Sequence, residues 1–259
     1  MNTETMELYK VRPDGTKEAE NRECLIEHEL EILVNEKPMY RLICTADQLK
    51  ELVYGRLYTD RIIDSVEDVK LCFLCKSEHT ATVLLDADKI LMQELDKELS
   101  CCSTSHRYRD IVGKRELKPI RERTVDWNRV FYLTKLFQED KGLHGSTGAV
   151  HKSILLYPGA DGRDETFICE DIGRHNTIDK VVGYAILRRI DLSKCMIFTS
   201  GRIPVDMTEK LIAAGVPTLV SKSVPTMDSA CMARKYGLNL ICRAWPDSCE
   251  FYHSTSDDM

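Results

Sequence analysis

Residues 169–180, CEDIGRHNTIDK, gather carboxylate, guanidinium, imidazole and amide side chains around a single glycine. An apolar helical pattern follows at once, which predicts that Asn176 caps a helix. Arg174 and His175 would then precede the helix and face outward. Helix N-termini bind anions through their backbone N–H groups, and an arginine fork suits phosphate oxygens. The segment therefore predicts an anion-binding or nucleotide-binding pocket.

Two more polar segments follow strand-like runs in the same manner. Residues 200–204 (SGRIP) follow the apolar run 195–199, and residues 221–226 (SKSVPT) follow the run 218–220. Ligands of α/β sheets bind at the carboxyl ends of the strands, so we expect the three segments to converge on one rim. The candidate ligand-binding residues on this rim are Asp171, Arg174, His175, Asn176, Ser200, Gly201, Arg202 and Ser221. For the first segment alone, a helix cap in which Asp171 pairs with Arg174 is the simpler interpretation, but three segments on one edge favour a binding site.

Residues 147–151 (TGAVH) form another element of this kind, and His144 precedes them. Either histidine could bind phosphate or a metal ion, although a lone histidine is more often a packing or capping residue. Thr147 and His151 join the candidate binding residues. A zinc deaminase needs a His-x-Glu or Cys-x-Glu pair and a later Pro-Cys-x-x-Cys. The sequence has neither, and we predict no metal site.

The eleven cysteines are odd in number and scattered, which argues against a secreted disulfide framework. Cys72 and Cys75 are three residues apart in a strand-like run, where they would point to opposite faces, so we interpret them as structural, with zinc or redox use as the alternative. Cys101 and Cys102 begin a polar, basic segment. Cationic neighbours favour the thiolate, which is the nucleophile. These two are the candidate catalytic thiols; the alternative is that both are incidental.

Composition excludes some classes of protein. The chain has 259 residues and a net charge of −6, which argues against a generic nucleic-acid-binding protein. It contains no run of about 18 apolar residues, so no membrane span is expected. The first ten residues have no apolar signal region, which predicts a cytoplasmic protein.

The N-terminal part, residues 1–99, is expected to be a small α+β unit. A hairpin is predicted around NEKPM (35–39), and two further strands within residues 66–86. Thr45 and Gln48 form a capping-box pattern at the start of a helix. Residues 100–123 are poor in apolar side chains, and lysine and arginine outnumber aspartate and glutamate there. This segment is predicted to be a long, mobile loop.

Residues 124–259 alternate helical and strand patterns after an initial helix marked by Trp127 and Phe137. Two strands are expected around a Pro-Gly and Asp-Gly turn, followed by helix, strand, helix, strand, helix and strand. Gly215 and Gly237 stand where helices end. Such alternation predicts an α/β domain with a mixed, mainly parallel sheet and helices on both faces.

Several stretches together resemble the FdhD/NarQ family, the formate dehydrogenase accessory sulfurtransferases. They are EDIGRHNTIDKVVG (170–183), TSGRIPVDMTEKLIAAGVPTLVSKSVPT (199–226) and TGAVH (147–151), with ECLIEHELEILVNEKPM (23–39) and TADQLKELVYGRLYTDRII (45–63) in the N-terminal part. The resemblance implies a three-layer α/β/α domain of the cytidine-deaminase-like fold without the deaminase zinc chemistry. It also implies a cytoplasmic homodimer.

The resemblance further implies a sulfur carrier. Members of the family accept sulfur from a cysteine desulfurase as a cysteine persulfide. They pass it to the bis-molybdopterin guanine dinucleotide form of the molybdenum cofactor before its insertion into formate dehydrogenase. The cofactor is thus a bound substrate, and GDP is expected to mimic its nucleotide end.

Two departures from the family pattern accompany this resemblance. The family carries sulfur on a Cys-x-x-Cys motif, but the equivalent stretch here is SCCSTS (100–105), in which Cys101 takes the first position and Thr104 the second. The family's cofactor-gripping tail corresponds to ICRAWPDSCEFY (241–252), which keeps Arg243 and has Ile241 in place of an aromatic residue. A non-catalytic, cofactor-binding chaperone is therefore the alternative function. A nucleotide hydrolase of deaminase-like fold is disfavoured by the missing zinc motif.

Overall fold

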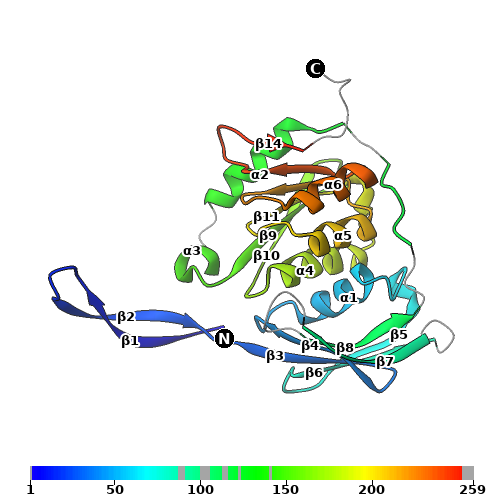
Figure 1. Cartoon of the computed structure of the whole chain (residues 1–259), viewed down its shortest axis with the longest axis horizontal. Helices are drawn as coiled ribbons and strands as arrows, with labels where there is room; N and C mark the ends of the chain where they lie inside the picture. The colour runs from blue at the N-terminus through cyan, green and yellow to red at the C-terminus, as the bar shows by residue number, and fades with distance from the viewer. Residues whose placement is uncertain are drawn as a thin grey trace.

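The computed structural model of the chain describes residues 2–86, 91–99, 106–112, 116–121, 124–139 and 142–252. These residues form a mixed α/β structure with two six-stranded sheets and a separate two-stranded hairpin (Figure 1). One six-stranded sheet belongs to the N-terminal half of the chain and the other to the C-terminal half. No helix within the described ranges is long and apolar enough to cross a membrane.

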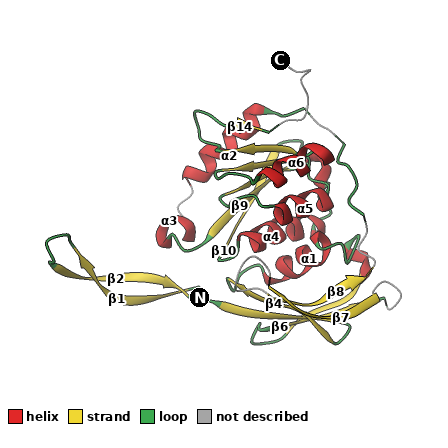
Figure 2. Cartoon of the chain, viewed as in Figure 1, coloured by secondary structure: helices red, strands yellow, loops and turns green. Residues whose placement is uncertain are grey.

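The chain begins with an arm, the hairpin of β1 (Thr3–Val11) and β2 (Lys17–Leu25), which projects from the body (Figure 2). Its turn holds Gly15 at φ +83°, a conformation that glycine adopts at little cost. An isolated two-stranded hairpin is marginally stable in water. The arm therefore depends on its base, where β2 contacts the short helix α3 (Leu143–Thr147).

The N-terminal sheet has the strand order β5-β6-β3-β4-β8-β7. Its elements are β3 (His28–Val34), β4 (Lys37–Cys44), α1 (Leu49–Thr59), the 3-10 turn η1 (Val66–Asp68), β5 (Val69–Leu74), β6 (Thr80–Leu85), β7 (Leu91–Leu99) and β8 (His106–Val112). The predicted hairpin is confirmed as β3–β4, and the two predicted strands are β5 and β6. Alternate residues of β3 are fully buried, and they include Leu30 and Ile32. They pack into one core with α1.

Strand β8 corrects the prediction of a continuous loop over residues 100–123. Its residues are mostly polar, so no apolar pattern marked it in the sequence. Its backbone nevertheless pairs on both sides, with Arg107 opposite Tyr40 of β4 and His106 opposite Leu99 of β7. Backbone hydrogen bonds between strands do not require apolar side chains. The prediction is therefore wrong for residues 106–112, and the mobility of the rest stays a prediction.

The start of α1 also differs from the sequence prediction. The helix begins at Leu49 with Gln48 as its N-cap, and Thr45 does not cap it. Thr45 is fully buried, and its Oγ1 accepts a hydrogen bond from Lys180 Nζ at 2.8 Å. The hydroxyl satisfies a buried ammonium group, so it is unavailable to a helix terminus.

The C-terminal sheet has the order β10-β9-β11-β12-β13-β14. Its elements are α2 (Trp127–Glu139), α3, β9 (His151–Pro158), β10 (Asp164–Asp171), α4 (Arg174–Leu187), the 3-10 turn η3 (Leu192–Lys194), β11 (Met196–Thr199), α5 (Val205–Ala214), β12 (Thr218–Ser221), α6 (Met227–Tyr236), β13 (Asn239–Cys242) and β14 (Glu250–Phe251). Gly215 and Gly237 end α5 and α6 in the left-handed conformation, as predicted.

The prediction of a mainly parallel sheet is wrong. Only β11, β12 and β13 pair in parallel, and the other pairings are antiparallel. The reason is the hairpin β9–β10: its first strand, not its second, pairs with β11. The sheet is therefore mixed. Strands β10 and β11 still point the same way, because the antiparallel β9 lies between them.

The two faces of this sheet are covered differently. On one face, α2 packs through Val130, Leu133 and Phe137 onto Ile154 and Phe198 of the sheet. The other face supports α4, α5 and α6, and the same apolar core continues through α1 into the N-terminal sheet. Helix α1 thus lies between the N-terminal sheet and α4 (Figure 1).

Helix α1 crosses α4 at two glycines, Gly55 and Gly183. A Cβ atom at Gly55 would overlap the backbone carbonyl oxygen of Asp179, and one at Gly183 would overlap that of Glu51. The two backbones are therefore in direct contact, and only glycine permits this approach.

A buried charge cluster stands beside the crossing. Asp179 is fully buried, and its Oδ1 accepts hydrogen bonds from Lys210 Nζ at 2.6 Å and Thr59 Oγ1 at 2.7 Å. Nε of the buried Arg56 lies 3.2 Å from a carboxylate oxygen of Asp60. Two carboxylates and two cations balance each other and join α1, α4 and α5. Removing one partner of a buried pair typically costs about 3–5 kcal/mol, so this cluster fixes the relative positions of the three helices.

We predict that Gly55→Ala lowers the free energy of unfolding by at least about 2 kcal/mol, because the added methyl group forces α1 away from α4. At an ordinary helix position the same substitution would stabilise the protein by about 1 kcal/mol, so the sign is diagnostic. Urea denaturation measures the effect, and Lys50→Ala at an exposed position of α1 is the control. A Gly55→Ala midpoint equal to or above that of the wild type would contradict the close crossing.

Candidate functional site

The candidate site lies on the rim formed by the carboxyl ends of β10, β11 and β12 and the start of β9. His151 at the start of β9 is paired with Asp171 at the end of β10. The loops after β11 and β12 are tied together, since Ser221 Oγ donates to the carbonyl oxygen of Gly201 at 2.8 Å. A Cβ at Gly201 would come within 3.0 Å of Arg174 Cβ, so this loop also touches α4. The predicted convergence of the three polar segments is confirmed.

The first turn of α4 differs from the prediction. The helix begins at Arg174 with Gly173 as N-cap, so Asn176 lies inside the first turn and does not cap it. The reason is Asp171, whose Oδ1 accepts a hydrogen bond from the Gly173 N–H at 2.9 Å, so the helix begins three residues earlier than predicted. The Asn176 amide donates instead to Asp171 Oδ1 at 2.8 Å and to the Ile43 carbonyl at 2.9 Å.

Asp171 is the centre of a buried network. It is fully buried, and its ion-pair partner is the equally buried Lys180 at 2.7 Å. The backbone N–H of Thr45 also donates to its Oδ2. The predicted site residues Asp171 and Asn176 therefore position the rim from within the body. A ligand on the surface would meet their neighbours rather than these side chains.

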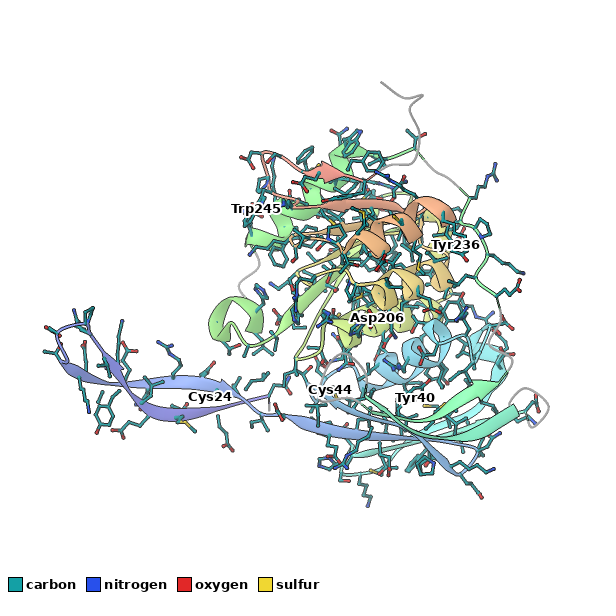
Figure 3. All side chains as sticks on the ribbon, viewed as in Figure 1. Cys24, Tyr40, Cys44, Asp206, Tyr236 and Trp245 are labelled. Carbon is teal, nitrogen blue, oxygen red and sulfur yellow. The ribbon has the colours of Figure 1, made fainter. Side chains whose placement is uncertain are left out.

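Three cationic or titratable side chains surround the start of α4. The stem of Arg174 is half-buried against Gly201. His175 does not face outward as predicted: it is buried, and its Nε2 lies 3.0 Å from Oδ2 of Asp206, the residue labelled in Figure 3, which links the N-termini of α4 and α5. Arg202 is exposed in the loop after β11. Arg174 at the first position of α4 and Arg202 in the loop after β11 thus both stand at the rim, whereas His175 is engaged by a carboxylate.

His151 and Ser200 join the start of β9 to the end of β11. His151 Nδ1 lies 3.3 Å from Ser200 Oγ, and that hydroxyl also accepts the Lys152 N–H at 3.0 Å. Burial lowers the pKa of His151, and the positive charge of Arg174 lowers it further. The imidazole is therefore neutral at pH 7 and acts there as a hydrogen-bonding group rather than as a cation.

Beside His151 the rim opens into a hollow of about 340 Å³. Its lining includes His144, His151, Ser200, Lys222 and Ser223. All of these except His144 lie within the polar motifs of the sequence, but His144, Lys222 and Ser223 are not among the predicted binding residues. The lysine stands inside SKSVPT and could have been chosen from its charge alone.

Two predicted binding residues, Thr147 and Arg243, do not line this hollow. Thr147 Oγ1 donates to the Leu143 carbonyl at 2.7 Å and accepts the Ala149 N–H at 3.1 Å, so it closes the end of α3. The Arg243 side chain is exposed and lies 3.3 Å from Glu250. Its backbone N–H, however, donates to the Ser223 carbonyl, so Arg243 tethers the tail to the rim.

The cysteines that the structure describes differ in burial and in thiol pKa. Cys101 and Cys102 lie outside the described residues, and every cysteine that the structure describes is a free thiol. Burial raises the pKa of Cys195 to about 12, and that of the Cys72 thiol rises for the same reason. Cys75 corrects its assignment to a strand: it follows β5 in a turn, and a hydrogen bond with Ser77 lowers its pKa to about 7.

Within the described ranges, no group of three or more His, Cys, Asp and Glu side chains is arranged to hold a metal ion.

We predict that Asp171→Ala lowers the free energy of unfolding by about 3–5 kcal/mol, because Lys180 would stay buried without its partner. The double variant Asp171→Leu/Lys180→Met should regain most of this loss, since it buries no charge. Urea denaturation compares the variants with Asp161→Ala, an exposed carboxylate, as control. Equal losses in the single and double variants would show that the ion pair is not the cause.

Comparison with known proteins gives concordant results. A sequence model of the FdhD/NarQ family matches residues 25–257, so β1 and all but the last residue of β2 precede the matched region. The Sulfur carrier protein FdhD of Bacillus pumilus is 29% identical over 233 residues, 88% of this chain and 87% of that protein. Its counterpart of the same name in Saccharolobus solfataricus is 31% identical over 195 residues, 74% of this chain and 72% of that protein.

The fold also matches a solved structure. A crystal structure from Desulfotalea psychrophila, assigned as a formate dehydrogenase accessory protein, superimposes with a TM-score of 0.74 at 20% sequence identity. The superposition covers 97% of this chain and 96% of that chain. The likeness therefore extends over both sheets.

Proposed function

Because the chain belongs to the FdhD/NarQ family, we propose that it is a sulfurtransferase that serves formate dehydrogenase. It accepts sulfur from a cysteine desulfurase as a cysteine persulfide. It passes the sulfur to the bis-molybdopterin guanine dinucleotide molybdenum cofactor, which binds as a substrate. The name that its relatives share, Sulfur carrier protein FdhD, supports the sulfur-carrying role.

The pairing of β7 and β8 carries this proposal. Leu99 and His106 lie opposite each other, so the segment that contains Cys101 and Cys102 joins these strands at one end. His106 also lies opposite Arg41 of β4. From Arg41 the chain runs four residues, or about 13 Å of strand, to Thr45. Because Thr45 contacts Asp171 beneath the rim, the anchors of the thiol segment face the rim side of the molecule.

The first chemical step needs one thiolate. The Cys101 or Cys102 thiolate attacks the terminal sulfur of the donor's persulfide, the donor's sulfur–sulfur bond breaks, and the donor leaves as a thiolate. The new bond places the transferred sulfur on this chain as a persulfide. The arginines that follow the cysteines in sequence favour the thiolate form.

The rim supplies the features that the nucleotide end of the cofactor requires. Arg174 stands there in the first turn of α4, Arg202 stands in the loop after β11, and the N-terminus of α4 lies at the rim. Guanidinium groups and helix N-termini both bind phosphate oxygens. As the resemblance implies, we also propose that the C-terminal layers have the cytidine-deaminase-like fold and that the protein is a cytoplasmic homodimer.

A non-catalytic chaperone for the same cofactor is the second candidate, because Thr104 stands at the second cysteine position of the family motif. It would use the same rim without a persulfide. The two functions therefore differ only in the thiol chemistry.

We predict that incubation with a cysteine desulfurase and cysteine adds the mass of one sulfur atom, which a reductant removes. Cys101→Ser should abolish the gain and Cys102→Ser should reduce it or leave it unchanged, since one thiolate suffices to carry a persulfide. Intact-protein mass spectrometry measures the gain, and Cys75→Ser is the control because Cys75 is a described thiol with a lowered pKa.

A wild-type protein that gains no sulfur would favour the chaperone. A Cys101→Ser/Cys102→Ser double variant that keeps the full gain, with loss of the gain in Cys75→Ser, would move the carrier to the turn after β5. Recovery of formate dehydrogenase activity in a deletion strain should follow the same order of variants.

We also predict that GDP binds the rim and that Arg174→Ala and Arg202→Ala each weaken its binding by about 1.5–3 kcal/mol, the scale of a charge-assisted hydrogen bond. Isothermal titration calorimetry measures both, with Arg163→Ala on the exposed β9–β10 turn as control. If both rim variants bind GDP with wild-type affinity, the nucleotide does not bind at this rim.

A further inference from the structure

Lys222 has an unusual setting for a lysine that lines a hollow. Its Nζ lies 5.4 Å from the ring centroid of Phe137 and 5.2 Å from that of Trp245. Both distances are within the range of cation–π attraction. No carboxylate pairs with it in the part of the chain that the structure describes. Two aromatic rings thus flank its charge, which no described carboxylate neutralises beside the hollow.

The neighbouring Lys152 provides the contrast. Its Nζ also lies 5.4 Å from the Phe137 ring, but it is fully buried and stands 3.6 Å from Glu170. The Glu170 carboxylate in turn accepts the N–H groups of Leu143 and His144 at the start of α3. Lys152 is therefore neutralised inside the body, whereas Lys222 faces the hollow.

The backbone holds Lys222 and Trp245 rigidly together. The Lys222 N–H donates to the Thr199 carbonyl at 3.0 Å, which extends the pairing of β11 with β12. The Ala244 N–H donates to the Ser221 carbonyl at 3.0 Å, and Trp245 is closed into a turn by its N–H bond to the Ser248 carbonyl at 2.8 Å. The lysine and the tryptophan therefore sit on two loops that are bonded to each other.

Trp245 keeps part of its ring accessible. The side chain is 42% exposed, and Figure 3 places it at the edge of the molecule on the side of α3. An exposed indole is an efficient stacking surface, and stacking of a base on an aromatic ring contributes about 1–3 kcal/mol. Trp245 can thus stack on a planar ring of a ligand while the neighbouring Lys222 binds an anionic group of the same ligand.

From this geometry we infer that Lys222 binds an anionic group of the ligand in the hollow and that Trp245 both positions Lys222 and stacks on a planar ring of the same ligand. The ligand class is a nucleotide, with its phosphate toward Lys222. The inference rests on the proposed function, because it describes the same rim, and it assigns contacts to two residues, Lys222 and Trp245, that are not among the predicted binding residues.

Fluorescence tests this inference directly, since the chain contains two tryptophans. In a Trp127→Phe background Trp245 is the sole indole, and Trp127 lies in α2 against Phe251, so the aromatic contact is retained. Titration with GDP, guanosine and pyrophosphate separates the contributions of ring and phosphate. We expect GDP and guanosine to quench Trp245, and pyrophosphate to compete with GDP.

The lysine is tested in the same background. Lys222→Gln should weaken binding of GDP and pyrophosphate about 10- to 100-fold, the scale of a lost charge-assisted hydrogen bond, and Lys222→Arg should restore most of it. Trp245→Leu should weaken the binding of GDP and of guanosine, which isothermal titration calorimetry measures. Lys235→Gln is the matched control, because Lys235 also lies over an aromatic ring, that of Tyr236 at 5.3 Å on α6.

The outcomes distinguish this inference from the proposed function. Wild-type affinity for GDP in Lys222→Gln and Trp245→Leu overturns the inference and leaves a nucleotide site on the rim. Binding of GDP without quenching of Trp245 overturns the stacking role. A wild-type protein that binds neither GDP nor pyrophosphate overturns both the inference and the cofactor proposal, whereas persulfide formation would still report on the sulfur-carrying step.

Discussion

The direct contact between the backbones of α1 and α4 is the constraint on which the rest of the molecule depends. Gly55 and Gly183 allow it, and the buried cluster around Asp179 fixes it. Helix α1 is covered on its other side by the N-terminal sheet, so the crossing joins the two sheets into one body. It also fixes the position of α4 against the N-terminal sheet, whereas the hydrogen bond from Gly173 to Asp171 sets the residue at which α4 begins. Because Arg174 and His175 are in the first turn of α4, the position of the rim follows from a helix contact that lies inside the core.

In the polar segment before and within α4, some side chains are buried and support the rim, and others remain accessible at its surface. Asp171, Asn176 and Asp179 are buried beneath the rim. Asp171 binds Thr45 and Lys180, and Asp179 binds Lys210. The Asn176 amide donates to Asp171, so this network supports the rim from within the body. Arg174 remains partly accessible and meets the loops after β11 and β12. Buried ion pairs contribute little net stability, but breaking them is costly, so they specify one arrangement of the loops. The proposed ligand contacts come from five separate segments, so they would depend on that one arrangement.

Much of this arrangement was predictable from the sequence, because local patterns determine it. The hairpins β3–β4 and β9–β10, the helix α2 and the convergence of the loops all followed from turn residues and apolar periodicity. The misplaced features depend on distant partners. Asn176 failed as a cap because Asp171 turned the chain earlier, and β8 was missed because only backbone pairing with β4 and β7 defines it. The arm β1–β2 has a Pro-Asp-Gly turn at residues 13–15 that could have revealed it.

The proposed function combines nucleotide binding at the rim with a thiol segment whose anchoring strands lie on the same side of the molecule. Its central claim is that one ligand is held by the segments 143–152, 173–177, 199–203, 221–226 and 243–248 together. Hydrogen–deuterium exchange with and without GDP tests this claim most directly. We expect the backbone amides of all five segments to exchange more slowly when GDP is bound. Slower exchange confined to another cavity, one of about 450 Å³ lined by Arg61 just after α1 and by residues 116–121, or no change in the five segments, would contradict it.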